Sequence, residues 1–115
     1  MATSMQYAST QQARHADLKV HATEVAELLK ILANPNRLLI LCGLIHNPLT
    51  VTEIAERVPN ISQSALSQNL TKMRSAGILR SEKTGLNVSY AIADERIASV
   101  LEVLEKNYCH LENDR

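Results

Sequence analysis

The sequence of 115 residues contains no phenylalanine and no tryptophan, so its only aromatic residues are three tyrosines. Single-strand nucleic-acid binders stack bases on aromatic side chains, and this scarcity argues against cold-shock and RRM-type proteins. No apolar run approaches the roughly 20 residues needed to cross a bilayer. The polar N-terminal segment also lacks the apolar core of a secretion signal. We therefore expect a single soluble, cytoplasmic domain with no membrane contact.

Cysteine is also scarce, because Cys42 and Cys109 are the only two and they form no CxxC motif and no Cys/His cluster. This pattern argues against a disulfide scaffold and a zinc finger. A small thiol oxidoreductase is the competing enzyme hypothesis, but no general base is spaced with either thiol. We expect a protein that is not an enzyme and carries no cofactor or metal. In a reducing cytosol, a disulfide between the two thiols would be transient.

The chain has no net charge, since twelve basic residues balance twelve acidic ones. The distribution is uneven. Residues 60–90 carry four basic residues against one acid, a net charge of +3, whereas residues 94–115 carry six acids against three basic residues, a net charge of −3. Local basicity can attract phosphate in a neutral protein. A solvated surface explains the same charges, so the pattern only permits a nucleic-acid partner.

The chain is expected to have an arm at residues 1–17, flexible or partly helical, a domain at residues 18–111 and a tail at residues 112–115. From about residue 18, apolar residues recur at helical spacing up to a helix end near Asn34. These residues are Leu18, Val25, Leu28, Leu29 and Leu32. The spacing predicts an amphipathic helix that faces a core.

Four further helices are predicted, because each has a capping residue at its expected start. The caps are Asn34 followed by Pro35, Thr50 in a capping box with Glu53, Ser62, and Asp94. The second helix is expected to end at residues 46–48 and the short third helix at residues 59–60. Gly77 is placed to end the fourth helix in a left-handed conformation.

Residues 86–92 change to a period of two, with Leu86, Val88, Tyr90 and Ile92 on one face, and this predicts a strand with a buried side. Residues 78–82 can pair with it through a turn at residues 83–85. The last helix has an apolar stripe from Ile97 to Leu111 that is longer than a small core needs. Part of this stripe is predicted to face a second subunit, although packing on its own domain alone is the alternative.

This order of elements predicts a mainly α fold with a β-hairpin wing, the winged helix-turn-helix arrangement. The outward face of the fourth helix is small and polar, which suits a helix that enters the DNA major groove. Basic residues of the hairpin can approach the backbone. The candidate DNA-binding residues are Gln63, Ser64, Ser67, Gln68, Thr71, Lys72, Arg80 and Lys83. A solvated helix face, or a winged helix that binds only protein, is the alternative interpretation.

The runs LLKILANPNRLLILCGL, ISQSALSQNLTKMRSAGIL and VSYAI resemble the ArsR/SmtB family of dimeric winged-helix bacterial repressors, over about residues 20–111. The resemblance implies a homodimer joined through its first and last helices. It also implies a pseudo-palindromic operator in double-stranded DNA, with the fourth helix in the major groove. The family usually has histidine after the second Ser-Gln, where this chain has Asn69.

Many family members bind metal ions, and this sequence departs from both of their ligand patterns. The segment LTVTEIA holds no thiol where one cysteine motif falls. On the last helix Asp94 matches, but Arg96 and Asn107 stand where metal binders have histidine, and arginine cannot be a ligand. His110 suits a fourth ligand position. All four histidines, the others being His15, His21 and His46, are nevertheless expected to be surface residues. A metal-responsive repressor with an atypical site remains the alternative.

The segments RLLILC and NYC place Cys42 and Cys109 as in the thiol-sensing BigR, SqrR and HlyU branch of the family. That resemblance implies a redox switch in which reactive sulfur species or another oxidant link the two thiols, directly or through added sulfur. Cys42 shares its helix face with Leu38, Leu41 and Ile45, so a buried unreactive cysteine is the other interpretation. Cys109 lies off the apolar stripe near a helix end, where a reagent can reach it.

Overall fold

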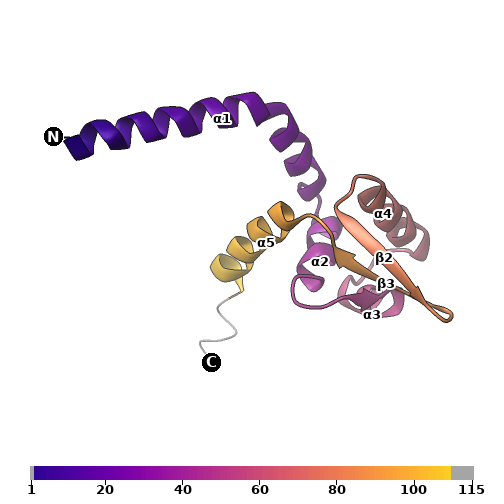
Figure 1. Ribbon diagram of the computed structural model, residues 1–115. Helices are drawn as coiled ribbons and strands as arrows, with labels where there is room; N and C mark the ends of the chain where they lie inside the picture. The colour runs from indigo at the N-terminus through magenta and orange to yellow at the C-terminus, as the bar shows by residue number, and fades with distance from the viewer. Residues whose placement is uncertain (1, 110–115) are drawn as a thin grey trace. The chain divides into compact units, whose positions relative to one another are not determined.

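The computed structural model describes residues 2–109, which form five helices and three strands (Figure 1). In chain order they are α1 (Ala2–Leu32), α2 (Pro35–Gly43), β1 (Leu49–Thr50), α3 (Val51–Arg57), α4 (Gln63–Ser75), β2 (Leu79–Thr84), β3 (Asn87–Ile92) and α5 (Glu95–Tyr108). The chain falls into two compact units, with the boundary after Ile31. None of the described helices is long and apolar enough to cross a membrane.

The first unit is α1, which runs without a break through the expected arm and the helix predicted from residue 18. The prediction that its apolar stripe faces a core stays a prediction, because such a core would lie outside this unit. Leu18 and Leu29 of the stripe are about half exposed. Apolar side chains also lie off the stripe, as at Val20.

The second unit begins its helices at the four predicted caps, all of which are confirmed. The Asn34 side chain accepts a hydrogen bond from the backbone N–H of Arg37, with proline at the first helical position. Thr50 and Glu53 form the reciprocal capping box of α3. Ser62 caps α4, and Asp94 caps α5. Each cap satisfies backbone donors that the first helical turn leaves unpaired.

The predicted hairpin forms from β2 and β3, but its turn lies two residues further along. Thr84 pairs with Asn87, which leaves a two-residue loop of Gly85 and Leu86. Gly85 has a φ of +64°, the left-handed conformation that the first position of such a loop requires. Leu86 is therefore at the tip and 98% exposed, so its predicted place on the buried face is wrong. The apolar alternation of this strand therefore begins at Val88 and does not include Leu86.

A third strand, β1, was not predicted. Leu49 pairs with Tyr90 and Thr50 with Ser89, which gives the antiparallel sheet order β1-β3-β2. Because Thr50 is both the last residue of β1 and the N-cap of α3, the sheet is joined directly to the start of the helix pair α3 and α4. The wing is thereby fixed to the body of the unit.

The core lies among α2, α3, α4, α5 and the body end of the hairpin. Its buried side chains are almost all aliphatic, and no buried side chain in the described part is polar or charged. The core residues of this unit are Leu32, Ile40, Leu41, Leu44, Leu49, Ile54, Val58, Leu66, Leu70, Met73, Ile78, Leu79, Tyr90, Ile97 and Leu101. Such packing leaves the polar faces of the helices and of the wing at the surface.

The cap of α5 generates a prediction about stability. Asp94 accepts hydrogen bonds from the Arg96 backbone N–H (2.9 Å) and from its guanidinium Nε and Nη2 (3.1 and 2.8 Å). The side-chain hydrogen bonds from Arg96 hold the pKa of Asp94 below its ordinary value. The ionised carboxylate therefore stabilises the fold fully above the ordinary aspartate pKa, and this contribution is lost as pH falls through the lowered pKa.

We expect Asp94→Ala to lower the free energy of unfolding by about 1 kcal/mol, the usual effect of removing a cap. Asp94→Asn should lower it less, because an amide oxygen can still cap the helix. Urea unfolding at neutral and acid pH measures both variants against the unchanged chain. The difference between wild type and Asp94→Asn should shrink on acidification, and a constant difference would contradict the role of the charge.

Candidate nucleic-acid interface and thiol pair

Helix α4 turns its polar face to the surface as the periodicity predicted. Leu66, Leu70 and Met73 are buried on the inward side. All six of the candidate DNA-binding residues on this helix are exposed: Gln63, Ser64, Ser67, Gln68, Thr71 and Lys72. The turn from α3 contains Asn60 in a left-handed conformation (φ 67°), which asparagine tolerates better than most residues. The helix pair thus presents a short row of hydrogen-bonding groups that is uncharged except for Lys72.

The end of α4 leads directly into the wing. The backbone N–H of Ile78 donates to the carbonyl of Met73, and that of Gly77 donates to the carbonyl of Arg74, with Gly77 at φ 79°. These two bonds form a Schellman motif, the C-terminal glycine cap predicted for this helix. Leu79 begins β2 immediately afterwards. The wing therefore leaves α4 at a fixed angle.

The two basic wing candidates differ in their position. Lys83 lies next to the loop in β2, opposite Val88, and is exposed. Arg80 lies at the body end of β2, where its Nη1 donates to the backbone carbonyl of Ile92 at 3.1 Å. Lys83 is thus the wing cation at the outer end of the hairpin, whereas the Arg80 guanidinium has one of its donors bound within the unit.

Asn69, the residue that departs from the family pattern, points toward α2 rather than outward. Its Oδ1 accepts a hydrogen bond of 3.0 Å from Nε of Arg37, and its Nδ2 donates to the backbone carbonyl of Ala65 at 3.0 Å. The side chain is half-buried. Sequence reasoning missed Arg37, because its partner lies 32 residues away and no local pattern connects the two.

The two thiols lie on neighbouring elements. Cys42 is half-buried in α2, and Cys109 is the exposed C-cap of α5. Burial raises the pKa of the Cys42 thiol, and the negative charges of Cys109 and Glu105 raise it further. Cys42 therefore stays protonated at neutral pH while Cys109 is open to reagents.

A polar contact joins the segment that follows α2 to helix α5. Nε2 of His46 lies 3.0 and 3.1 Å from the two carboxylate oxygens of Glu105. His46 follows Cys42 by four residues, and Glu105 precedes Cys109 by four. His46 and His21 are exposed, as expected of surface histidines. The side chains of His15 and His110 are outside the part that the structure describes.

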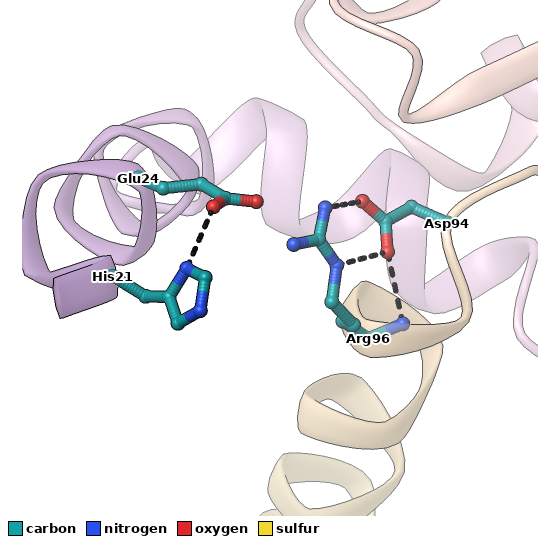
Figure 2. Close-up of polar contacts among 4 residues, drawn as sticks. All are labelled: His21, Glu24, Asp94 and Arg96. Atoms are coloured by element: carbon teal, nitrogen blue, oxygen red, sulfur yellow. Dashed lines mark hydrogen bonds and ion pairs between the residues drawn. The ribbon is translucent and has the colours of Figure 1, made fainter. Parts of the chain in front are cut away.

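The described residues contain no group of three His, Cys, Asp or Glu side chains placed to hold a metal ion. Figure 2 shows His21 with Glu24 in α1 and Asp94 with Arg96 at the start of α5. Asp94, which matches a family metal position, is thus engaged by a cation. His110, which suits a fourth ligand position, is outside the described residues.

Comparison with known proteins places this fold and surface in a family. The sequence profile of bacterial regulatory proteins of the arsR family matches residues 34–81. The HTH-type transcriptional regulator YgaV of Escherichia coli (strain K12) is 36% identical over 94 residues, covering 82% of this chain and 95% of its own length. The chain belongs to the ArsR family. The resemblance inferred from its motifs is confirmed, and this ArsR-family protein is a DNA-binding transcriptional regulator.

Two further relatives support the fold and the branch. The transcriptional activator HlyU of Vibrio cholerae is 36% identical over 93 residues, covering 81% of this chain and 85% of its own. The crystal structure of the transcriptional repressor BigR from Xylella fastidiosa superposes with a TM-score of 0.76 at 30% identity, covering 83% of this chain and 96% of that one. The winged helix-turn-helix fold is thereby confirmed.

The environment of Cys42 generates a prediction about reactivity. Because its pKa is raised, we expect the rate of Cys42 alkylation by iodoacetamide to stay low at neutral pH. The rate should rise at higher pH than it does for the same thiol in urea-unfolded protein. Peptide mass spectrometry after timed alkylation measures Cys42 separately from Cys109.

Two variants test the charges that act on Cys42. Cys109→Ser and Glu105→Gln each remove one negative charge, so each should move the alkylation profile of Cys42 to lower pH. Glu102→Gln is the matched control, because this exposed carboxylate of α5 is not among the groups that shift Cys42. If Cys109→Ser kept the wild-type profile, the effect of Cys109 on the pKa of Cys42 would be wrong.

Proposed function

We propose that this ArsR-family protein is a dimeric repressor that binds a pseudo-palindromic operator and releases it when Cys42 and Cys109 become linked. The observation that carries the proposal is the packing of α2, which holds Cys42, against α5, which Cys109 caps. The contact of 3.0 Å between His46, four residues after Cys42, and Glu105, four residues before Cys109, also supports a linkage. Reactive sulfur species and other thiol oxidants are the proposed inducers.

The chemistry divides between the two cysteines according to their exposure. The exposed Cys109 thiolate attacks an organic disulfide and forms a mixed disulfide, releasing one thiolate of the reagent. Cys42 then loses its proton to solvent and attacks Sγ of Cys109, which releases the second thiolate and completes the bridge. With an organic trisulfide, both attacks occur at its central sulfur, so one sulfur atom remains between the cysteines. Each linked pair is oxidised by two electrons, and the reagent is reduced to two thiolates.

The length of the link decides which product fits. A direct disulfide requires Cα atoms about 4.4–6.8 Å apart, whereas an inserted sulfur atom spans a wider gap. Cys109 stands at the last turn of α5, so a bridge pulls the end of that helix against α2. The proposal requires this displacement to change how the two recognition helices of the dimer are spaced along the DNA.

The proposed dimer is supported by apolar side chains that the single chain leaves exposed on α5. Val100 is 40% exposed, Val103 58% and Tyr108 77%. Residues of this kind clustered on one helix are typical of a protein interface. Leu111, which would extend the stripe, is outside the described residues. A second copy of the chain is the proposed partner for this surface.

The proposed base reading is tested by comparing two duplexes. One is selected by the wild-type protein from a random-sequence pool, and the other is scrambled to the same composition. Gln68→Ala should weaken binding to the selected duplex by about 1–3 kcal/mol and leave the scrambled duplex almost unaffected. Lys83→Ala should weaken both duplexes and reduce the salt slope by about one unit. Equal losses on both duplexes for Gln68→Ala would mean that Gln68 contacts only the backbone.

The proposed switch is tested by treating reduced protein with an organic disulfide or trisulfide and measuring its affinity for the selected duplex. We expect the reduced protein to bind and the treated protein to bind more weakly. A coupling of about 1–3 kcal/mol corresponds to a change of roughly 5- to 150-fold. Cys42→Ser and Cys109→Ser should each bind normally and fail to respond. Intact mass identifies the linked product and the number of added sulfur atoms.

Two outcomes would overturn the two-thiol switch. If Cys109→Ser still released DNA after treatment, the first nucleophile would be wrong. If zinc released DNA from the reduced protein, the metal-responsive alternative would replace the proposal. A winged helix that binds only protein is distinguished by the absence of salt-dependent DNA binding. Turnover of a disulfide substrate would instead favour a thiol oxidoreductase.

A further inference from the structure

The recognition helix is attached to the rest of its unit mainly by apolar packing. Leu66, Leu70 and Met73 are 2% exposed or less. Apolar burial is non-directional, so it favours contact without fixing how far a helix rotates about its axis. A hydrogen bond between side chains is directional and does fix such a rotation. The polar contacts from α4 to other elements therefore set its rotation.

Within the described residues, two side-chain hydrogen bonds join α4 to other elements. At its C-terminal end, Nη1 of Arg74 donates to the hydroxyl of Ser81 in β2 at 3.3 Å. At its middle, Arg37 of α2 donates to Asn69 at 3.0 Å. The second contact is the stronger one, because it is shorter and half-buried, whereas the contact of Arg74 is exposed.

Asn69 is held on both sides of its amide group. The bond from Nδ2 to the carbonyl of Ala65 fixes which way the amide faces, so Oδ1 is presented to α2. Arg37 is itself anchored, because its backbone N–H is bound by the Asn34 cap. The backbone of Arg37 and the amide group of Asn69 are therefore both held in place by further hydrogen bonds.

We propose that the Arg37–Asn69 hydrogen bond is a positioning contact that fixes the rotation of α4 and so directs Gln68 and its neighbours at the base edges. Successive residues of a helix are 100° apart. With Asn69 turned toward α2, the adjacent Gln68 is carried round to the exposed polar face. This inference rests on the proposed role of α4 as the base-reading helix.

The test compares Asn69→Ala, Arg37→Gln and the double variant on the selected and scrambled duplexes. We expect each single change to reduce the ratio of selected to scrambled affinity by about tenfold, the effect of losing one charge-assisted hydrogen bond. The double variant should lose no more than either single variant, because both changes break the same bond. The salt slope should stay unchanged, since no phosphate contact is removed.

Two further variants separate positioning from helix stability. Asn107→Ala is the matched control, because Asn107 of α5 makes the same bond to a carbonyl four residues earlier and contacts no other helix through it. It should leave the affinity ratio unchanged. Asn69→Asp keeps an oxygen that can accept from Arg37 and should restore most of the ratio. Thermal unfolding of every variant shows whether a loss of folded protein accounts for any change.

Three results would overturn the inference. Arg37→Gln could lower both affinities and the salt slope while Asn69→Ala has no effect, which would make Arg37 a phosphate contact. All variants could keep the wild-type ratio while unfolding more easily, which would make the bond merely structural. The double variant could lose the product of the two single effects, which would make the residues independent. Failure of the base-reading role itself is recognised separately, because Gln68→Ala would then leave the ratio unchanged.

Discussion

The buried face of α2, formed by Ile40, Leu41 and Leu44, is the contact on which the rest of the second unit depends. This helix of nine residues packs against both α3 and α5. Each fully buried aliphatic side chain contributes about 1.5–3 kcal/mol by leaving water. A helix this short would not be stable alone, so its position is set by this burial. The buried face of α2 therefore also sets where its polar side chains lie.

Local signals in the sequence were sufficient to place the helix starts. A cap such as Thr50 and its partner Glu53 are three residues apart, so one short segment contains the complete interaction. The same holds for Asn34 before Pro35 and for Gly77 after α4. Each of these residues does one conformational task that few other residue types do as well. Prediction from the residue type is reliable where the task is this narrow.

What could not be predicted depends on residues that are far apart in the sequence. The strand β1 has only two residues, and it exists because Leu49 and Thr50 meet β3 about forty positions later. The partners His46 and Glu105 are 59 residues apart. No periodicity connects such pairs, because their contact follows from how the helices pack. In the hairpin, by contrast, a local ambiguity misplaced Leu86, since alternation alone does not show where a strand ends.

In the candidate site, too, local patterns predict some features and only the packed structure gives the others. The exposed row on α4 follows from helical periodicity, and the identity of both cysteines follows from family motifs. The burial of Cys42 and the charges that act on it required the packed structure, as did the inward turn of Asn69. The apolar stripe of α5 is longer than one small core needs, because its members Val100 and Tyr108 remain exposed.

Helix α2 holds both a residue of the proposed thiol switch and a residue that contacts α4. Arg37 lies in its first turn, Cys42 in its last, and the whole helix is only about 13 Å long. A rigid segment of that length transmits a displacement at one end to the other. Under the proposed switch, a bridge to Cys109 moves α2, and the Arg37–Asn69 bond carries that movement to α4. One charged hydrogen bond is worth about 1.5–3 kcal/mol, which is the size of coupling that an effective switch requires. The proposed switch thus needs no large rearrangement, because the loss of this one contact supplies a coupling of that size.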